Sequence, residues 1–293
     1  MERLEILKTY KIYIGGQFPR TESGRYYTPK DKAGNILANV CLSSRKDLRN
    51  AVQAARKAFG PWAERPAFNR GQIIYRIAEM LEARRSQFID ELLKQGSTTA
   101  QAEKEINLSI DRLVYYAGWC DKYQQIFSSV NPVASSHFNF SALEPMGVIG
   151  VVAPQDSSLI GLISTIIPLV TGGNTVVVLA SENLPLCAVT FAEVLQSSDV
   201  PGGIINILTG QEKELLAHFG THMDINAISY GSNSDANYHQ LKTLGTDSVK
   251  RVKRFTLNAF DEKAESPYMI SDFQEVKTTW HPIENIGGST STY

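Results

Sequence analysis

The sequence lacks the features by which several large classes of protein are recognised. It holds only three cysteines, Cys41, Cys120 and Cys187, which lie far apart and form no CxxC pair. With no histidine at ligand spacing, this pattern excludes a disulfide framework and a cysteine-based metal site, so no metal is predicted. Each cysteine is therefore expected to be a small buried apolar residue.

An excess of charge and a long apolar run are also missing. The chain has 29 Lys and Arg against 30 Asp and Glu, a formal net charge of -1, so no overall attraction to nucleic acid or anionic membrane is expected. The longest apolar run, residues 159–170, is shorter than the roughly 20 residues of a membrane helix. No signal-like segment opens the chain. These absences predict a cytoplasmic protein without nucleic-acid or membrane partners.

What is present is a change of pattern near residue 145. Before it, apolar residues at three- and four-residue spacing predict a helix that stops at Gly60-Pro61 and two long helices over about 67–93 and 99–125. After it, apolar strands alternate with helices; the strands are expected at 148–154, 175–180, 203–208, 225–230 and about 251–257. This alternation predicts an α/β fold: a doubly wound, Rossmann-like parallel sheet preceded by long N-terminal helices.

Two further features locate a possible site and a possible interface. Residues 128–144 are rich in Ser and alternate apolar with polar residues, which favours a β-hairpin projecting from the body. In parallel sheets a ligand binds beyond the carboxyl ends of the strands, which directs attention to the turns at 154–158, 180–183, 209–211 and 231–234. None of these turns carries GxGxxG, so the usual phosphate-binding fingerprint is missing.

Several blocks resemble the aldehyde dehydrogenase superfamily, in the right order and at the right spacing. They read EPMGVIGVVAPQDSSL, GGNTVVVLASENLPL, PGGIINILTG and YGS. The resemblance implies a cofactor-binding domain over 1–266 that includes an oligomerisation hairpin at 128–144, and a short remnant of the catalytic domain, or tail, over 267–293. The chain is also similar to the degenerate second module, lacking the catalytic Cys, of two-module aldehyde dehydrogenases.

The resemblance places different residues where the family carries its chemistry. Asp156 stands where the family has the Asn that stabilises an oxyanion, and an ionised carboxylate only accepts hydrogen bonds. The alternative interpretation of Asp156 is a hydrophilic turn residue before a helix cap at Ser157. Asn258 stands where the family has its general base Glu, and an amide does not accept a proton near neutral pH. Asp261 and Glu262 are conceivable substitutes, but an inserted polar loop is the preferred interpretation.

The places that hold the dinucleotide in the family are only partly kept. Leu179 replaces the Lys and Glu182 matches the Glu that hold the ribose, although Glu182 is equally explained as an acid at the start of a helix. Gly231 and Ser232 match the Gly-Ser pair that receives pyrophosphate if one residue is deleted before them, leaving a vestigial anion site. No cofactor is predicted; NAD(P) is implied only if activity is retained.

These differences, with no Cys after Cys187 to supply the family's nucleophile, predict a non-catalytic pseudoenzyme. We expect it to be a structural or regulatory partner of a full-length aldehyde dehydrogenase chain, or of itself. The contact is expected through the edge of the hairpin, since no strand is foreseen to complete it. The alternatives are a subunit of an NAD(P)-dependent aldehyde dehydrogenase with retained activity, and a truncated gene product without function.

Overall fold

The centre of the protein is a five-stranded parallel sheet. We describe it from a computed structural model of the chain, over residues 6–31, 33–261 and 264–283. The strand order is β10-β9-β6-β7-β8. The strands are β6 (Val148–Val152), β7 (Thr175–Leu179), β8 (Ile205–Leu208), β9 (Ala227–Tyr230) and β10 (Arg251–Arg254). Every residue of β6 to β9 is buried, as expected for a sheet covered on both faces. The predicted doubly wound α/β fold is confirmed.

Helices cover the two faces with separate apolar clusters. One cluster joins the sheet to α1 (Arg45–Ala63), α8 (Glu212–Thr221) and α9 (Asp235–Leu244). The other joins it to α6 (Ile160–Thr171), α7 (Leu186–Gln196) and the N-terminal helices. Helix α1 continues through Gly60 and Pro61, where we expected it to end. The buried Trp62 explains this, because its indole N–H donates to the Val170 carbonyl at 3.0 Å and fixes the last turn.

The N-terminal helical region has more breaks than the sequence indicated. It consists of α2 (Ala67–Ala83), α3 (Arg85–Lys94), α4 (Thr99–Ala117) and α5 (Tyr123–Phe127). The single helix expected over 67–93 is broken at Arg84, whose backbone leaves helical geometry. The helix expected over 99–125 ends at Gly118. Small elements complete the fold: β1 (Thr9–Tyr10), β2 (Tyr26–Tyr27), β3 (Asn39–Cys41), the 3-10 turn η1 (Thr246–Ser248) and α10 (Tyr268–Ser271).

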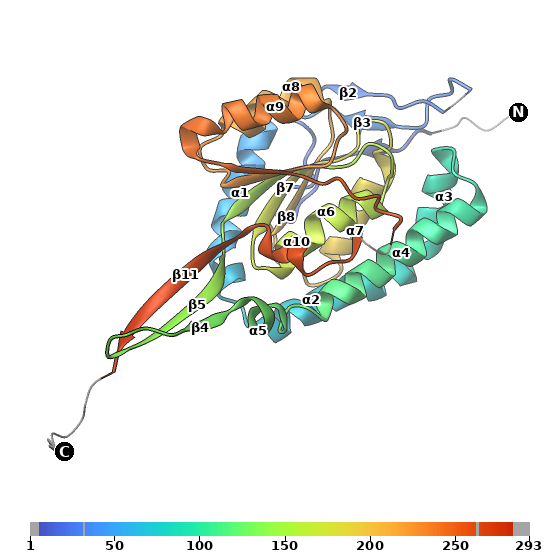
Figure 1. Cartoon of the computed structure of the whole chain (residues 1–293). Helices are drawn as coiled ribbons and strands as arrows, with labels where there is room; N and C mark the ends of the chain where they lie inside the picture. Colours follow the sequence, from blue (N-terminus) through green and yellow to red (C-terminus); the bar gives the residue numbers. More distant parts are fainter. Residues whose placement is uncertain (1–5, 32, 262–263, 284–293) are drawn as a thin grey trace, which may run out of the picture.

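A three-stranded antiparallel sheet projects from the body, as Figure 1 shows at its lower left. It contains β4 (Ser129–Asn131), β5 (His137–Pro145) and β11 (Gln274–Pro282), in the order β11-β5-β4. The predicted hairpin is therefore present, but the expectation that no strand completes it is wrong. Strand β11 pairs with the whole of β5. Its β-branched and aromatic residues favour a strand, and the Thr278 and Ser141 hydroxyls lie 2.8 Å apart across the pair.

Two smaller expectations can also be compared with the structure. All three cysteines are buried, as predicted. In the described part of the chain, no helix combines the length and the apolar character needed to cross a bilayer.

Candidate functional site

The turn after β6 is held by an unusually complete set of hydrogen bonds. The Ser157 hydroxyl accepts from the Gly161 N–H at 2.9 Å, although the N-cap residue of α6 is Leu159 and not Ser157 as predicted. From α4, the Glu105 side chain accepts from the Leu159 and Ile160 N–H groups at 2.8 and 3.1 Å. The N–H groups that open α6 are thus bound to side chains of the protein itself. Such groups are otherwise the natural donors for an anion.

The turn is acidic. Glu105 is buried, and this burial raises the pKa of its carboxyl group, an effect that the backbone donors offset only in part. The charge of Asp156 raises the pKa of Glu105 further, which places the two carboxyl groups near each other. Asp156 itself is exposed.

A cavity of about 480 Å³ lies beside this turn. We call it the turn cavity. Helices α3 and α4 and the turn form its walls, and Phe260 from the segment after β10 completes them. Its charged lining residues are Lys104, Glu105 and Asp156. It therefore lies beyond the carboxyl end of β6, where a doubly wound sheet places its ligand.

Asn258, the residue at the predicted position of a base, is exposed and belongs to a local turn. Its side-chain oxygen accepts from the Phe260 N–H at 3.0 Å, and its carbonyl accepts from the Asp261 N–H at 2.9 Å. This geometry agrees with the interpretation of an inserted polar loop. Glu262, the other candidate base, lies outside the described residues.

Arg112 holds that loop in place, and the sequence analysis did not single it out. Its guanidinium is fully buried and donates to the Ser164 hydroxyl at 2.6 Å and to the Glu265 carboxylate at 3.1 Å. It also donates to three loop carbonyls, those of Ala259, Asp261 and Ala264. The signal available was one arginine on the apolar face of a helix. Its partners are remote in sequence, which is why the pattern alone did not show its role.

The two places that match the dinucleotide-binding residues of the family are linked by side chains of the protein. Glu182 accepts from the Glu212 N–H at 3.3 Å. The Glu212 carboxylate in turn accepts from the Tyr230 hydroxyl at 2.6 Å and from the Asn237 amide at 2.9 Å. The turn beyond β7 and the turn beyond β9 are therefore joined through acidic side chains. Leu179, at the place of the family's Lys, is buried.

Gly231 and Ser232 follow β9 and are both buried. A Cβ atom at Gly231 would lie 2.7 Å from the Pro154 ring and 2.9 Å from the Val152 carbonyl oxygen. The close approach of two turns thus explains this glycine without a ligand.

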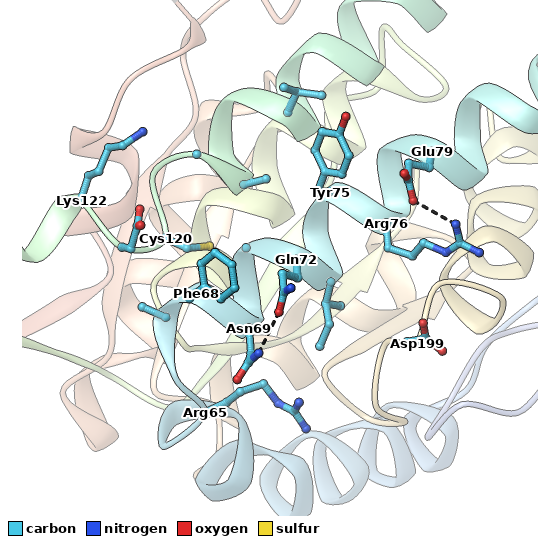
Figure 2. A pocket seen from close by; sticks show the side chains of 17 residues that line it. Arg65, Phe68, Asn69, Gln72, Tyr75, Arg76, Glu79, Cys120, Lys122 and Asp199 are labelled. Carbon is cyan, nitrogen blue, oxygen red and sulfur yellow. Dashed lines mark hydrogen bonds and ion pairs between the residues drawn. The ribbon is translucent and has the colours of Figure 1, made fainter.

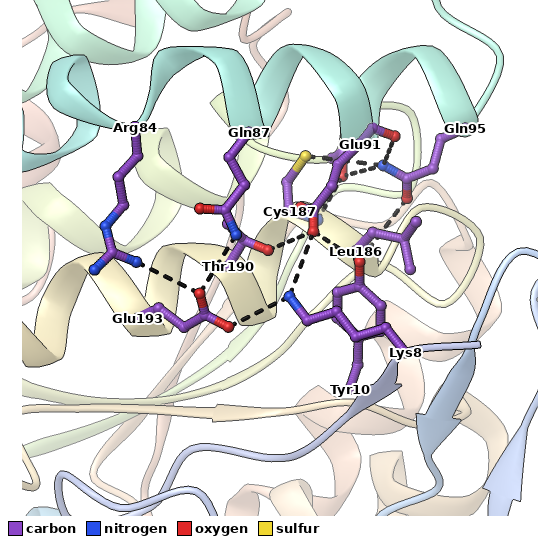
Figure 3. A network of polar contacts seen from close by, with 11 residues as sticks. Lys8, Tyr10, Arg84, Gln87, Glu91, Gln95, Leu186, Cys187, Thr190 and Glu193 are labelled. Carbon is purple, nitrogen blue, oxygen red and sulfur yellow. Dashed lines mark hydrogen bonds and ion pairs between the residues drawn. The ribbon is translucent and has the colours of Figure 1, made fainter. Parts of the chain in front are cut away.

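Cys187 lies within a polar network between α3 and α7, drawn in Figure 3. Glu91 accepts from the Tyr10 hydroxyl at 2.7 Å and from the Thr190 hydroxyl at 2.6 Å. Gln95 donates to the Ser158 hydroxyl at 3.0 Å and so ties this network to the turn. Complete burial raises the pKa of the Cys187 thiol well above its ordinary value. The thiol is therefore a structural group and not a reactive one.

A wider cavity, of about 840 Å³, lies away from the sheet edge, between α2 and the end of α4 (Figure 2). Polar side chains in it satisfy each other. The Asn69 amide donates to Gln72 at 2.8 Å, and Arg76 pairs with Glu79 at 2.9 Å. Cys120 lines this cavity, but none of the positions that the family resemblance singled out does.

The comparisons with known proteins agree with this geometry. The aldehyde dehydrogenase family profile matches residues 19–259. The chain belongs to this family. It is 30% identical over 260 residues to the cytosolic 10-formyltetrahydrofolate dehydrogenase of Mus musculus, covering 86% of this chain and 29% of that protein. The Xenopus tropicalis protein of the same name is 31% identical over 249 residues, covering 83% of this chain and 28% of that protein.

Solved structures of family members show the same fold. An aldehyde dehydrogenase from Bacillus cereus, determined as an NAD+ complex, superposes with a TM-score of 0.80 at 26% identity. The match covers 84% of this chain and 50% of that one. The chain thus spans half or less of the length of these family members, and the matched part is the one that carries the Rossmann-like sheet.

Proposed function

We propose that this chain is a non-catalytic member of the aldehyde dehydrogenase family that assembles with an active aldehyde dehydrogenase chain, or with itself, as a structural or regulatory subunit. The observation that carries the proposal is the chemistry of the turn after β6. Family catalysis needs a donor there for a developing oxyanion. Asp156 offers only acceptor oxygens at neutral pH. Glu105 already takes the Leu159 and Ile160 N–H groups.

Among residues 6–31, 33–261 and 264–283, the groups at the other catalytic positions of the family are unsuited to those roles. The Asn258 amide is not a proton acceptor near neutral pH, and its oxygen is bound to the Phe260 N–H. The cysteines are buried; burial raises the pKa of the Cys120 thiol to about 12 and that of Cys187 well above its ordinary value. A thiol that stays protonated is a poor nucleophile. We therefore infer that the chain itself does not attack an aldehyde.

We also infer that NAD(P) does not bind. A dinucleotide brings two negative phosphates, whereas the Glu212 carboxylate lies between the turns that would receive it. Leu179 offers no charge-assisted hydrogen bond to a ribose. The Tyr230 hydroxyl and the Asn237 amide, which could donate to a ligand here, already donate to Glu212. These residues do not fit the cofactor.

The assembly surface proposed is the three-stranded projecting sheet. Strands β11 and β4 are the two edge strands of this sheet, and nearly all residues of β11 are exposed. Val276 and Trp280 on β11 are 67% and 57% exposed, and Val130 on β4 is 68% exposed. An unpaired strand edge with exposed apolar residues favours pairing with another chain.

Co-expression with a tagged, full-length aldehyde dehydrogenase tests the assembly. We expect the two chains to co-purify, or this chain alone to elute as an oligomer in gel filtration. Val276→Lys should weaken the assembly, because it puts a charge on the β11 edge. Val249→Lys is the matched control, since Val249 is 91% exposed and lies outside the projecting sheet. A stable monomer that does not co-purify with the dehydrogenase would contradict the proposal.

Calorimetric titration with NAD+ tests the loss of cofactor binding. We expect no binding at sub-millimolar concentration and no reduction of NAD+ or NADP+ with propanal by the chain alone. Binding or turnover would instead support the second candidate, an NAD(P)-dependent aldehyde dehydrogenase subunit, which the match to enzymes of the family favours.

A further inference from the structure

The turn cavity combines apolar walls with a few charged groups. Leu92, Leu184 and Phe260 supply the apolar part of its lining. Its volume of about 480 Å³ falls in the range of small-molecule sites. Phe260 comes from the loop that Arg112 fixes through its buried guanidinium, so this wall is held in place before any ligand arrives.

Most polar side chains around the cavity are engaged by the protein itself. Gln95 donates to Ser158, and Ser158 donates to the Leu184 carbonyl at 2.9 Å. Ser157 accepts from the start of α6, and Glu105 does the same. Their role is to shape the cavity and not to receive a ligand.

Two charged groups of opposite sign are the exception. Across residues 6–31, 33–261 and 264–283, neither Lys104 nor Asp156 forms an ion pair or a side-chain hydrogen bond. Both line the cavity and both are exposed to it. Lys104 belongs to α4 and Asp156 to the turn after β6, so the backbone holds the two charges on different walls.

We propose that the turn cavity binds a small zwitterion that carries one amine and one carboxylate, with the ammonium group at Asp156 and the carboxylate at Lys104. The opposite signs of Asp156 and Lys104 fix the orientation of the ligand. A simple amine or a simple carboxylate would satisfy only one of the two charges. The ligand class goes beyond the role as a partner subunit and does not depend on it.

The test uses a series of ω-amino acids of increasing length, from glycine through 4-aminobutyrate to 6-aminohexanoate. Binding to the purified chain is measured by calorimetry and by ligand-observed NMR at millimolar concentrations. We expect one length to bind more tightly than the others, because only one spans the two charges. Butylamine and butyrate are the single-charge controls, and each should bind at least about tenfold more weakly than the best zwitterion.

Variants assign the binding to the cavity. Asp156→Asn and Lys104→Gln should each weaken binding of the best zwitterion by about tenfold or more. Glu103→Gln and Lys213→Gln are matched controls, because these exposed residues are not among those that line the cavity; both should bind like the natural chain. All four variants change exposed side chains, and circular dichroism checks that they fold.

Three results would overturn the proposal. These are no binding by any member of the series, equal binding of butylamine or butyrate, and binding that Asp156→Asn and Lys104→Gln leave unchanged. None of them affects co-purification with a dehydrogenase, so failure here is distinguishable from failure of the proposed assembly.

Discussion

The two ends of the central sheet, where its parallel strands begin and where they finish, differ in how their polar groups are used. At the edge where the strands begin, the fully buried Asn174 accepts from the Gly147 N–H and donates to the Phe273 carbonyl, both at 3.0 Å. Asn226 accepts from the Val148 N–H at 3.0 Å and from Arg56 at 2.6 Å. Every one of these side chains serves the fold.

At the end of the sheet where the strands finish, some charged residues have no bonding partner in the described part of the chain. Lys104 and Asp156 face a cavity without partners in the described residues, while Glu105, Glu182 and Glu212 bind backbone or side-chain donors of the chain. The comparison teaches that unpaired charges are kept at the end of the sheet where a doubly wound fold places its ligand. Substitutions at the two edges should therefore separate stability from binding.

The largest expected effect tests whether the carboxyl edge also contains a structural element. Arg112→Met removes a buried cation that holds the Glu265 carboxylate and three loop carbonyls. The free energy of unfolding should fall by about 3 kcal/mol, measured by chemical denaturation, and the loop at 258–266 should become sensitive to protease. Arg76→Met removes an exposed ion pair with Glu79 and should cost less than about 1 kcal/mol. Equal losses would contradict the bracing role of Arg112.

The next effect compares the same side chain at the two edges. Asn174→Ala leaves the buried Gly147 N–H and Phe273 carbonyl without their partner, so the free energy of unfolding should fall by about 2–3 kcal/mol. Asn183→Ala changes an exposed amide in the turn after β7 and should stay within about 0.5 kcal/mol of the natural chain. If both variants lost the same stability in urea unfolding, the contrast between the edges would be wrong.

Much of this contrast follows from the sequence, but its details do not. The strands β6 to β10 fall inside the predicted ranges. For β6 to β9 the reason is that continuous apolar runs identify buried strands locally, whereas β10, with the sequence RVKR, is only half-buried. Strand β11 was missed because its partner β5 is remote in sequence, and a nine-residue strand on an exposed edge has no strong apolar signal.

The candidate site divides in the same way. The sequence identified the turn around Asp156 and the polar role of Ser157 beside the start of α6, since both are local features. It did not identify Arg112 or Glu105, whose functions arise from contacts between α4 and segments far along the chain. The family resemblance indicated which positions to examine, whereas only the structure shows which partners occupy them.

A third experiment uses pH to probe the buried acid beside the turn. Burial raises the pKa of Glu105 in the folded chain, so the folded protein holds this proton more tightly than the unfolded one. The resulting stabilisation is fully present below the ordinary Glu pKa, about 4.3, and is lost as pH rises through the raised folded pKa. Glu105→Gln keeps an oxygen for the Leu159 N–H but cannot ionise.

Between about pH 4.3 and neutral pH, the free energy of unfolding of the variant should therefore fall less than that of the natural chain. The difference should be smaller than the losses expected for Arg112→Met and Asn174→Ala. Urea midpoints across this range measure it. Glu103→Gln changes an exposed acid two positions away on α4 and should keep the natural profile. If the stability of Glu105→Gln changed with pH in parallel with that of the natural chain, the Glu105 carboxyl would have the same pKa in the folded and the unfolded state.

The smallest effect on stability distinguishes the two interpretations of Asp156. If this carboxylate is kept for a ligand, Asp156→Asn should change the free energy of unfolding by less than about 0.5 kcal/mol, because no described side chain pairs with it. Ser157→Ala removes the acceptor of the Gly161 N–H and should cost about 1 kcal/mol, as the loss of a helix cap does. The two residues are neighbours on one turn, so the same denaturation experiment compares them directly. A loss at Asp156 as large as that at Ser157 would mean that the carboxylate serves the turn itself, and that the carboxyl edge is as structural as the opposite one.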